Sequence, residues 1–166
     1  MTHEELMRKA CELSAENVAQ GGGPFGAVIA RNGEIIATGV NRVTANCDPT
    51  AHAEVSAIRA AATRLGTFNL KGCTIYTSCE PCPMCLSAIY WAHLDAIYYG
   101  NNKQDAARIG FDDQFIYDEL ALPPHRRRIL QRCQQPARSS GRARPSSTSS
   151  SSSLFSSFWS LFSFFQ

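Results

Sequence analysis

Apolar and polar residues alternate along the first 66 residues with two spacings, one typical of helices and one typical of strands. At the amino end, apolar residues recur at roughly helical intervals, and Thr2 and Glu5 have the spacing of a capping box. Two short apolar stretches then flank Asn32-Gly33, a dipeptide typical of tight hairpin turns. These patterns predict a helix over residues 3–19, strands over 27–30 and 35–40, and a helix over 51–65.

The next segment, up to residue 120, continues this alternation of strands and helices. Residues 73–78 are rich in strand-forming residues, and Pro81 can open a helix because proline is common at the first helical position. The order αββαβαβα indicates an α/β domain in which helices cover a sheet. The predicted elements are a strand over 73–78, a helix over 81–93, a strand over 96–99 and weaker helices over 103–109 and 113–120.

Charge and composition divide the chain into two parts. Residues 1–120 contain all 14 acidic residues and nine of the 16 basic ones, which gives this part a net charge of −5. The last 46 residues contain seven arginines, no acidic residue and a serine-dominated run at 146–153. We therefore expect a folded domain over residues 1–131 and a disordered Arg/Ser-rich tail over 132–166.

Seven cysteines, an odd number, include a tight cluster at Cys79, Cys82 and Cys85. A disulfide framework rarely has this spacing, and the amino end shows no secretory signal. The aromatic stretch near the carboxyl end is broken by serines and is shorter than the about 20 apolar residues that a membrane-spanning helix needs. We expect a cytoplasmic protein, not bound to a membrane, whose clustered cysteines bind a metal or take part in catalysis.

Two short motifs together indicate a zinc site, namely His52-Ala53-Glu54 and Pro81-Cys82-Pro83-Met84-Cys85. One imidazole and two thiolates supply three of the four zinc ligands and leave the fourth position for water. We expect His52 in the first turn of one helix, and Cys82 and Cys85 on one face of the first turn of the next. Glu54 cannot share the direction of His52, so it can reach the water and take its proton. The combined pattern is that of zinc-dependent nucleobase deaminases.

The position of Cys79 leaves alternatives open. Its spacing to the other two cysteines resembles the start of an iron–sulfur run, although Ile89 and Tyr90 stand where that pattern requires cysteine and proline. Cys79 could instead fill the fourth zinc position and make the site structural. A cluster of reduced core cysteines without metal is a third interpretation.

Residues 1 to about 130 resemble the guanine deaminases of the cytidine and deoxycytidylate deaminase superfamily. The zinc motifs are shared with the whole superfamily, whereas Tyr90-Trp91 and Gly110-Phe111-Asp112-Asp113 are more specific to guanine-type members. The matching stretches are Gly23-Pro24-Phe25-Gly26-Ala27-Val28, Asp48-Pro49-Thr50-Ala51-His52-Ala53-Glu54-Val55, Thr77-Ser78-Cys79-Glu80-Pro81-Cys82-Pro83-Met84-Cys85, Ala88-Ile89-Tyr90-Trp91-Ala92, Ile109-Gly110-Phe111-Asp112-Asp113 and Phe115-Ile116-Tyr117.

This resemblance implies a three-layer αβα sandwich with a five-stranded mixed sheet, a homodimer, one Zn²⁺ per subunit, and hydrolysis of guanine to xanthine and ammonia in purine catabolism. It implies that His52, Cys82 and Cys85 bind the zinc and that Glu54 and Asp113 are catalytic, with Asp113 facing the amine-bearing edge of the base. The residues that would contact the substrate are Asn41, Phe25, Trp91 and Ala53.

Most of these assignments beyond the zinc motifs have a simpler interpretation. Asn41 could be a turn residue at a strand end, and Asp113 could cap the last helix. Phe25 and Trp91 could be core aromatics. The tail also departs from the resemblance, because in the family the last segment folds over the partner subunit's active site and its end closes on the base. The Arg/Ser-rich tail has no match to that segment, so we expect the zinc site to form but guanine to be held loosely.

Two other classes of function remain open from the sequence. tRNA adenosine deaminases share both zinc motifs, but a net charge of −5 over residues 1–120 is unfavourable for binding a polyanion. Guanosine or cytosine could also be the substrate, because the same zinc-dependent deamination acts on their exocyclic amines. The unmatched tail also allows a zinc-binding protein without catalysis, although a purely structural site has no use for Glu54.

Overall fold

The computed structural model describes residues 1–130, which form one compact unit. The expectation of a disordered tail over 132–166 lies outside the described residues. Within residues 1–130, no helix is both long enough and apolar enough to cross a membrane.

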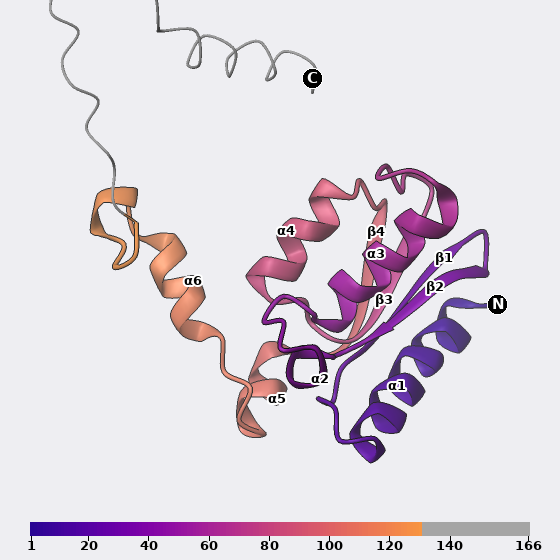
Figure 1. Ribbon diagram of the computed structural model, residues 1–166, viewed down its shortest axis with the longest axis horizontal. Coiled ribbons are helices and arrows are strands. Elements are labelled where there is room, and N and C mark those ends of the chain that lie inside the picture. Colours follow the sequence, from indigo (N-terminus) through magenta and orange to yellow (C-terminus); the bar gives the residue numbers. More distant parts are fainter. Residues whose placement is uncertain (131–166) are drawn as a thin grey trace, which may run out of the picture. The chain divides into compact units, whose positions relative to one another are not determined.

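Helices and strands follow one another in nearly the order that the sequence predicts. The single-turn helix α2 and the 3₁₀ turn η1 are the elements of residues 1–130 that the pattern does not predict. The elements, in chain order, are α1 His3–Ala19, β1 Gly26–Arg31, β2 Glu34–Val40, α2 Val43–Asn46, α3 Ala53–Leu65, β3 Thr74–Cys79, α4 Pro83–Trp91, β4 Ala96–Asn101, α5 Lys103–Arg108, α6 Gln114–Ala121 and η1 Pro124–Arg126 (Figure 1).

The strands of residues 1–130 form one mixed sheet in the order β2-β1-β3-β4. β1 pairs antiparallel with both β2 and β3, whereas β3 and β4 run parallel. The expected mixed sheet is confirmed, but the expected number of five strands is wrong for this part of the chain, which has four. After β4, Asn102 and Asp105 form a capping box, so α5 begins at once. The apolar residues beyond α5 have helical spacing and form α6 instead of a strand.

Helices cover both faces of this sheet, with α1 on one side and α3 and α4 on the other (Figure 1). Along β1, Val28 and Ala30 pack with Leu6 of α1 in one core cluster. Ala27 and Ile29 point to the opposite face and pack in a second cluster with residues of α3 and α4. A strand buried on both faces shows this period of two. The expected three-layer αβα arrangement is therefore confirmed.

Two local predictions are confirmed by the geometry of individual residues. Thr2 Oγ1 accepts a hydrogen bond from Glu5 N at 3.2 Å, and Glu5 Oε2 accepts one from Thr2 N at 2.8 Å, which completes the capping box of α1. Asn32 and Gly33 both have positive φ, 51° and 77°, as a tight hairpin requires. Both features depend only on neighbours in the chain, which is why the sequence reveals them.

The start of α3 differs from the prediction by two residues. The helix begins at Ala53, not at residue 51, because Asp48 Oδ1 accepts a hydrogen bond from Thr50 N at 2.8 Å and holds the preceding segment in a turn. His52 keeps an extended conformation, with φ −67° and ψ 157°. It is therefore the N-cap residue of α3 and does not lie in its first turn.

The start of α4 also differs from the prediction by two residues. The helix begins at Pro83, not at Pro81. A proline disfavours the helical conformation in the residue before it, and Cys82 is extended with ψ 168°. Cys82 is thus the N-cap residue of α4. Cys85 lies within the first turn as expected, but Cys82 does not.

The approach of α3 to β2 depends on Gly39. A Cβ atom at this position would overlap backbone atoms of Ala53 and Ala57. The missing side chain therefore lets the first turn of α3 lie directly against β2. Next to this contact, Arg42 N donates to Ala51 O at 2.9 Å, so the end of β2 at Asn41 lies beside the start of α3 at His52.

Candidate metal centre and surrounding cavity

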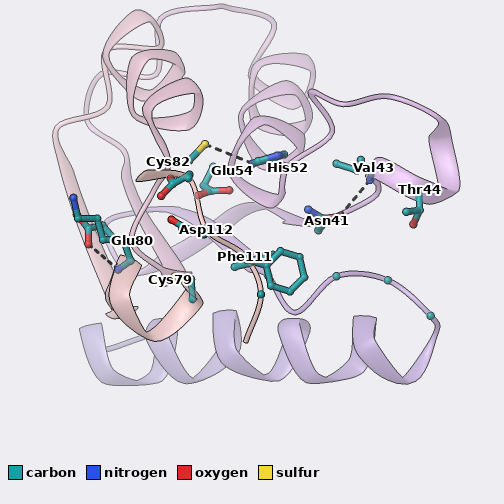
Figure 2. Close-up of a pocket in the computed structure, with 18 residues that line it drawn as sticks. Asn41, Val43, Thr44, His52, Glu54, Cys79, Glu80, Cys82, Phe111 and Asp112 are labelled. Atoms are coloured by element: carbon teal, nitrogen blue, oxygen red, sulfur yellow. Dashed lines mark hydrogen bonds between the residues drawn. The ribbon is translucent and has the colours of Figure 1, made fainter. Parts of the chain in front are cut away.

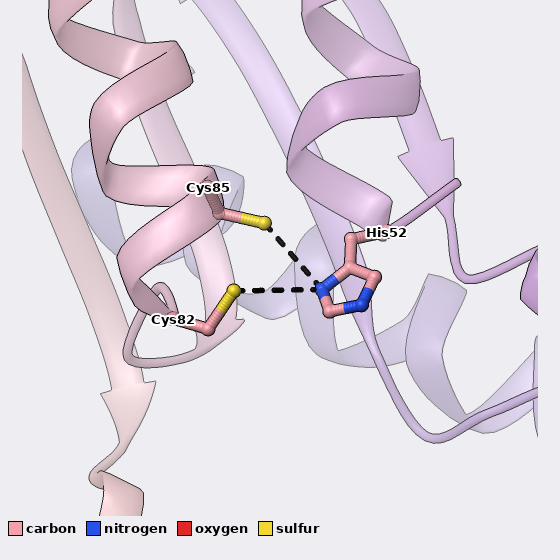
Figure 3. A group of neighbouring side chains, drawn as sticks. All are labelled: His52, Cys82 and Cys85. Carbon is pink, nitrogen blue, oxygen red and sulfur yellow. Dashed lines mark hydrogen bonds between the residues drawn. The ribbon is translucent and has the colours of Figure 1, made fainter. Parts of the chain in front are cut away.

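Three side chains from the ends of two helices converge on one point. His52 caps α3, Cys82 caps α4, and Cys85 lies in the first turn of α4. Figure 3 shows both sulfur atoms turned toward the same imidazole nitrogen. His52 Nδ1 lies 3.6 Å from Cys82 Sγ and 3.5 Å from Cys85 Sγ. All three ligand atoms lie within 4.8 Å of one another, so they are close enough to bind one metal ion.

The distances within this group fit a tetrahedral zinc ion. With Zn–N bonds of about 2.0–2.1 Å and Zn–S bonds of about 2.3 Å, a tetrahedral angle separates nitrogen from sulfur by about 3.6 Å. The two observed separations, 3.6 and 3.5 Å, agree with this value. A single imidazole nitrogen carries at most one proton, so two equal hydrogen bonds to sulfur are a poorer explanation of the geometry than a shared cation.

Cys79 ends β3 and lies outside this group. Among residues 1–130, the group of potential ligand atoms consists of His52, Cys82 and Cys85. Cys79 Sγ instead lies 3.7 Å from the carbonyl oxygen of Asn102, and burial raises the pKa of its thiol to about 11. The arrangement therefore favours three protein ligands and a fourth position for water, which is the pattern of a catalytic zinc site.

The two sulfur atoms of the group differ in acidity. A hydrogen bond from Cys85 lowers the pKa of Cys82 to about 4 despite partial burial. The same hydrogen bond, together with burial, raises the pKa of Cys85. The contact with Cys82 raises the pKa of His52. The lowered pKa of Cys82 favours its thiolate, which is the form of cysteine that binds zinc.

Glu54 lies beside this group, in the first turn of α3. Its side chain is buried, with only 8 % of the residue surface exposed, and burial raises the pKa of its carboxyl group. In Figure 2, the Glu54 carboxylate lies between Cys82 and His52 in this view. A buried carboxyl group with a raised pKa is a stronger base than an exposed one, which suits a group that takes a proton from water.

A cavity of about 610 Å³ opens beside the three ligand atoms. Small-molecule sites commonly have volumes of about 300–1,000 Å³, so the cavity suits a ligand of that size. Trp91 and Ala53 do not line it, since Trp91 is 81 % exposed at the end of α4 and Ala53 is buried at the start of α3. Within residues 1–130, the structure thus does not bring these two residues to the cavity. The sequence-predicted residues that do line it are Phe25, Asn41, His52, Glu54, Cys82 and Asp113.

Asn41 is held in place by its neighbours. Its Oδ1 accepts a hydrogen bond from Val43 N at 3.3 Å, so the interpretation as a turn residue is correct in part. This bond uses the oxygen and leaves the side-chain N–H groups for a ligand. The buried Asn17 donates from Nδ2 to the carbonyl oxygens of Gly23 at 2.8 Å and Asn41 at 2.9 Å. Asn17 thereby joins the glycine-rich loop to Asn41, although its position in α1 gives no sequence signal of this role.

Asp112 and Asp113, which precede α6, have different roles. Asp112 Oδ1 accepts a hydrogen bond from Gln114 N at 2.9 Å and so caps the helix. Asp113 makes no side-chain capping bond and lines the cavity, where burial raises the pKa of its carboxyl group. The capping function therefore belongs to Asp112, and the carboxylate of Asp113 is left for the cavity.

Other residues line the cavity although no sequence pattern assigns them a role. Glu80 Oε2 accepts a hydrogen bond from Lys103 N at 3.0 Å and thereby joins the end of β3 to α5 (Figure 2). Phe111 lies in the Gly110-Phe111-Asp112-Asp113 motif and forms part of the wall. The Gly21-Gly22-Gly23 run, which breaks the helical pattern just before Phe25, is the one clear sequence signal for this side of the cavity.

Comparison with known proteins relates this geometry to a family. Residues 1–101 match the family described as the cytidine and deoxycytidylate deaminase zinc-binding region. A guanine deaminase of Bacillus subtilis (strain 168) is 55 % identical over 130 residues, which covers 78 % of this chain and 83 % of that protein. A tRNA-specific adenosine deaminase of the same organism is 39 % identical over 101 residues, 60 % of this chain and 63 % of that protein.

The fold agrees with these sequence matches. An X-ray structure of guanine deaminase from Bacillus subtilis has a TM-score of 0.79 and 52 % sequence identity to this chain, and the match covers 82 % of this chain and 88 % of that one. The matched zinc-binding region contains His52, Cys82 and Cys85, whose geometry fits zinc. The chain therefore belongs to the cytidine and deoxycytidylate deaminase zinc-binding family.

Proposed function

We propose that the protein is a zinc-dependent guanine deaminase, which converts guanine and water to xanthine and ammonia as a step of purine catabolism. The observation that carries this proposal is the convergence of His52, Cys82 and Cys85 beside the buried Glu54 at the wall of a cavity of small-molecule size. The relative named guanine deaminase, 55 % identical over 130 residues, supports guanine as the substrate. In this proposal His52, Cys82 and Cys85 hold one zinc ion per subunit.

The chemistry requires one positioned carboxyl group next to the metal. His52, Cys82 and Cys85 would hold the zinc, which would lower the pKa of water so that hydroxide is available for the attack at neutral pH. Glu54 takes one proton from the attacking water and gives it to a ring nitrogen as the C–O bond forms. It then moves the remaining proton of that oxygen to the amine, so the C–N bond breaks and ammonia leaves. Burial of Glu54 supports this role because it raises the pKa of the carboxyl group and so makes the carboxylate a stronger base toward the water proton.

The cavity wall suits a flat base that carries an exocyclic amine. The ring of Phe25 offers apolar surface for stacking on a base. The Asn41 side-chain N–H groups can donate to a ring nitrogen or carbonyl, and the Asp113 carboxylate can accept from the amine. Guanine presents all of these groups on one small ring system, so each wall residue has a partner.

We expect guanine to be preferred over nucleosides and over RNA. A panel of free guanine, guanosine, cytosine and a tRNA anticodon stem-loop, with ammonia release as the readout, tests the substrate. The expected result is a kcat/KM for guanine at least about 100-fold above that of each other substrate, since binding groups matched to one base leave polar atoms unpaired with another. RNA is disfavoured because residues 1–120 carry a net charge of −5.

Two results of the panel would contradict the proposal. Faster deamination of the tRNA stem-loop than of guanine would make the protein an RNA-modifying enzyme, as the similarity to a tRNA-specific adenosine deaminase allows. One bound zinc per chain with no ammonia from any substrate would indicate a non-catalytic zinc protein. The same assay also gives the KM for guanine. This value tests the expectation that guanine is held loosely, which was based on the segment beyond residue 130.

The protein acts as a cytoplasmic homodimer whose catalytic domain spans residues 1–131. Exposed Cys11 and Cys47 thiols support a reducing compartment.

Tyr90 and Trp91, which are 73 % and 81 % exposed on α4, support a dimer because large exposed aromatics are enriched at protein interfaces. Light scattering should show a dimer at micromolar concentration and a shift toward monomer in Trp91→Ser. A monomeric wild-type protein would contradict the dimer.

A further inference from the structure

We propose that Phe111 is a positioning residue whose contact with Phe25 holds the Gly110–Asp113 segment against the cavity and thereby fixes the Asp113 carboxylate. The contact between the two rings is inferred from geometry alone. The expected effect on turnover rests on the proposed function. Phe111 and Phe25 both line the cavity. Their rings meet edge to face, with centroids 4.9 Å apart and an interplanar angle of 89°.

The two partners of this contact differ in how firmly they are held. Phe25 packs against the core cluster formed by the sheet, α3 and α4, so its ring is fixed by the body of the domain. Phe111 is 45 % exposed and lies on the connection between α5 and α6 (Figure 2). An edge-to-face aromatic pair is a directional contact. It therefore sets the position of the connection relative to the core.

The connection itself has a defined local shape. Gly110 has φ 92°, a conformation that favours glycine, and Phe111 N donates to Ala106 O at 3.0 Å, which closes the end of α5. Asp112 then caps α6 through Gln114 N. The segment from residue 110 to residue 114 is thus fixed internally, and a displacement of Phe111 would carry Asp113 with it.

Few other contacts hold this segment to the rest of the described chain. Neither α5 nor α6 contains a buried residue. The Lys103 backbone N–H donates to Glu80, but Lys103 is at the opposite end of α5 from Phe111. The Lys103 ammonium lies 4.1 Å from the centroid of the Tyr117 ring, but this contact joins α5 to α6 and not to the core. The Phe25–Phe111 pair is therefore an apolar contact that joins the Asp113 segment directly to the core.

The kinetic test compares Phe111→Ala with Phe111→Tyr and with Phe115→Ala, a matched control. Phe115 is also an exposed phenylalanine, at 58 %, but it does not line the cavity. A displacement of about 1 Å in a catalytic group can cost about 100-fold in rate, so we expect Phe111→Ala to lower kcat for guanine by about 10–100-fold with a smaller change in KM. Phe111→Tyr should restore most of the rate, and Phe115→Ala and zinc content should stay near wild type.

A double-substitution cycle tests whether Phe111 acts through Asp113. If it does, Phe111→Ala should lower kcat by less than about threefold when Asp113 is already asparagine, since groups that act as one unit are not additive. A full 10–100-fold loss in the Asp113→Asn background would overturn the inference. An equal loss in Phe115→Ala would also overturn it, because it would show a general effect of the helical segment.

Hydrogen–deuterium exchange tests the contact without any turnover. Backbone amides of residues 110–114 should exchange faster in Phe111→Ala than in wild type or Phe115→Ala, because the anchor to Phe25 is lost. Unchanged exchange would overturn the inference even if guanine is deaminated. Faster exchange together with a wild-type protein inactive on guanine would refute the proposed function and leave the positioning contact supported.

Discussion

Replacing Glu54 with glutamine should reduce kcat for guanine by about 10³-fold or more, since general acid–base groups contribute about 10²–10⁴-fold and Glu54 is proposed to transfer two protons in turn. Glutamine has nearly the same shape but cannot take a proton from water. Glu54 is buried beside the ligand atoms yet is not one of them. Zinc content measured by plasma mass spectrometry should therefore stay at the wild-type level while ammonia release is lost.

The control for this substitution is Glu34→Gln, which removes an exposed carboxyl group at the start of β2, outside the cavity. Its kcat should match that of wild type. Turnover in Glu54→Gln within tenfold of wild type would remove Glu54 from the proposed mechanism. Loss of zinc in the same variant would instead indicate that Glu54 supports the metal site, and the assignment as a proton-transfer group would then fail.

The three residues of the candidate metal centre were predictable from the sequence because each lies in a short motif with its own constraint. Two cysteines three residues apart at a helix start reach the same point whatever the rest of the fold does. The exact helix starts were not predictable in the same way. Pro81 and Pro83 compete for the first helical position, and the steric effect of Pro83 on Cys82 decides the outcome. The result changes Cys82 from a first-turn residue to an N-cap residue without moving it away from His52.

The wall of the cavity was less predictable because it is assembled from residues distant in sequence. Phe25 and Phe111 are 86 positions apart, and nothing in either local pattern shows that their rings meet. The capping role fell to Asp112, not Asp113, because the turn after Gly110 aims the first carboxylate at Gln114 N. The resemblance predicted five strands, whereas residues 1–130 contain four. The sequence after β4 has helical spacing and forms α6.

Replacing Cys85 with alanine should abolish zinc binding and activity together. Cys85 is fully buried with its Sγ 3.5 Å from His52 Nδ1, so alanine removes one of three protein ligands and no described side chain is placed to replace it. We expect bound zinc to fall from about one ion to less than about 0.1 per chain after dialysis, because a two-ligand site binds zinc weakly.

The matched substitution for this experiment is Cys79→Ala, which removes a neighbouring buried cysteine outside the ligand group. Because Cys79 Sγ lies 3.7 Å from the Asn102 carbonyl oxygen and outside the group of ligand atoms, Cys79→Ala should retain about one zinc per chain. Plasma mass spectrometry of both variants decides between a three-ligand and a four-ligand site. Zinc lost from Cys79→Ala would show that Cys79 completes the coordination shell, and a closed shell of four protein ligands has no position at which water could be activated.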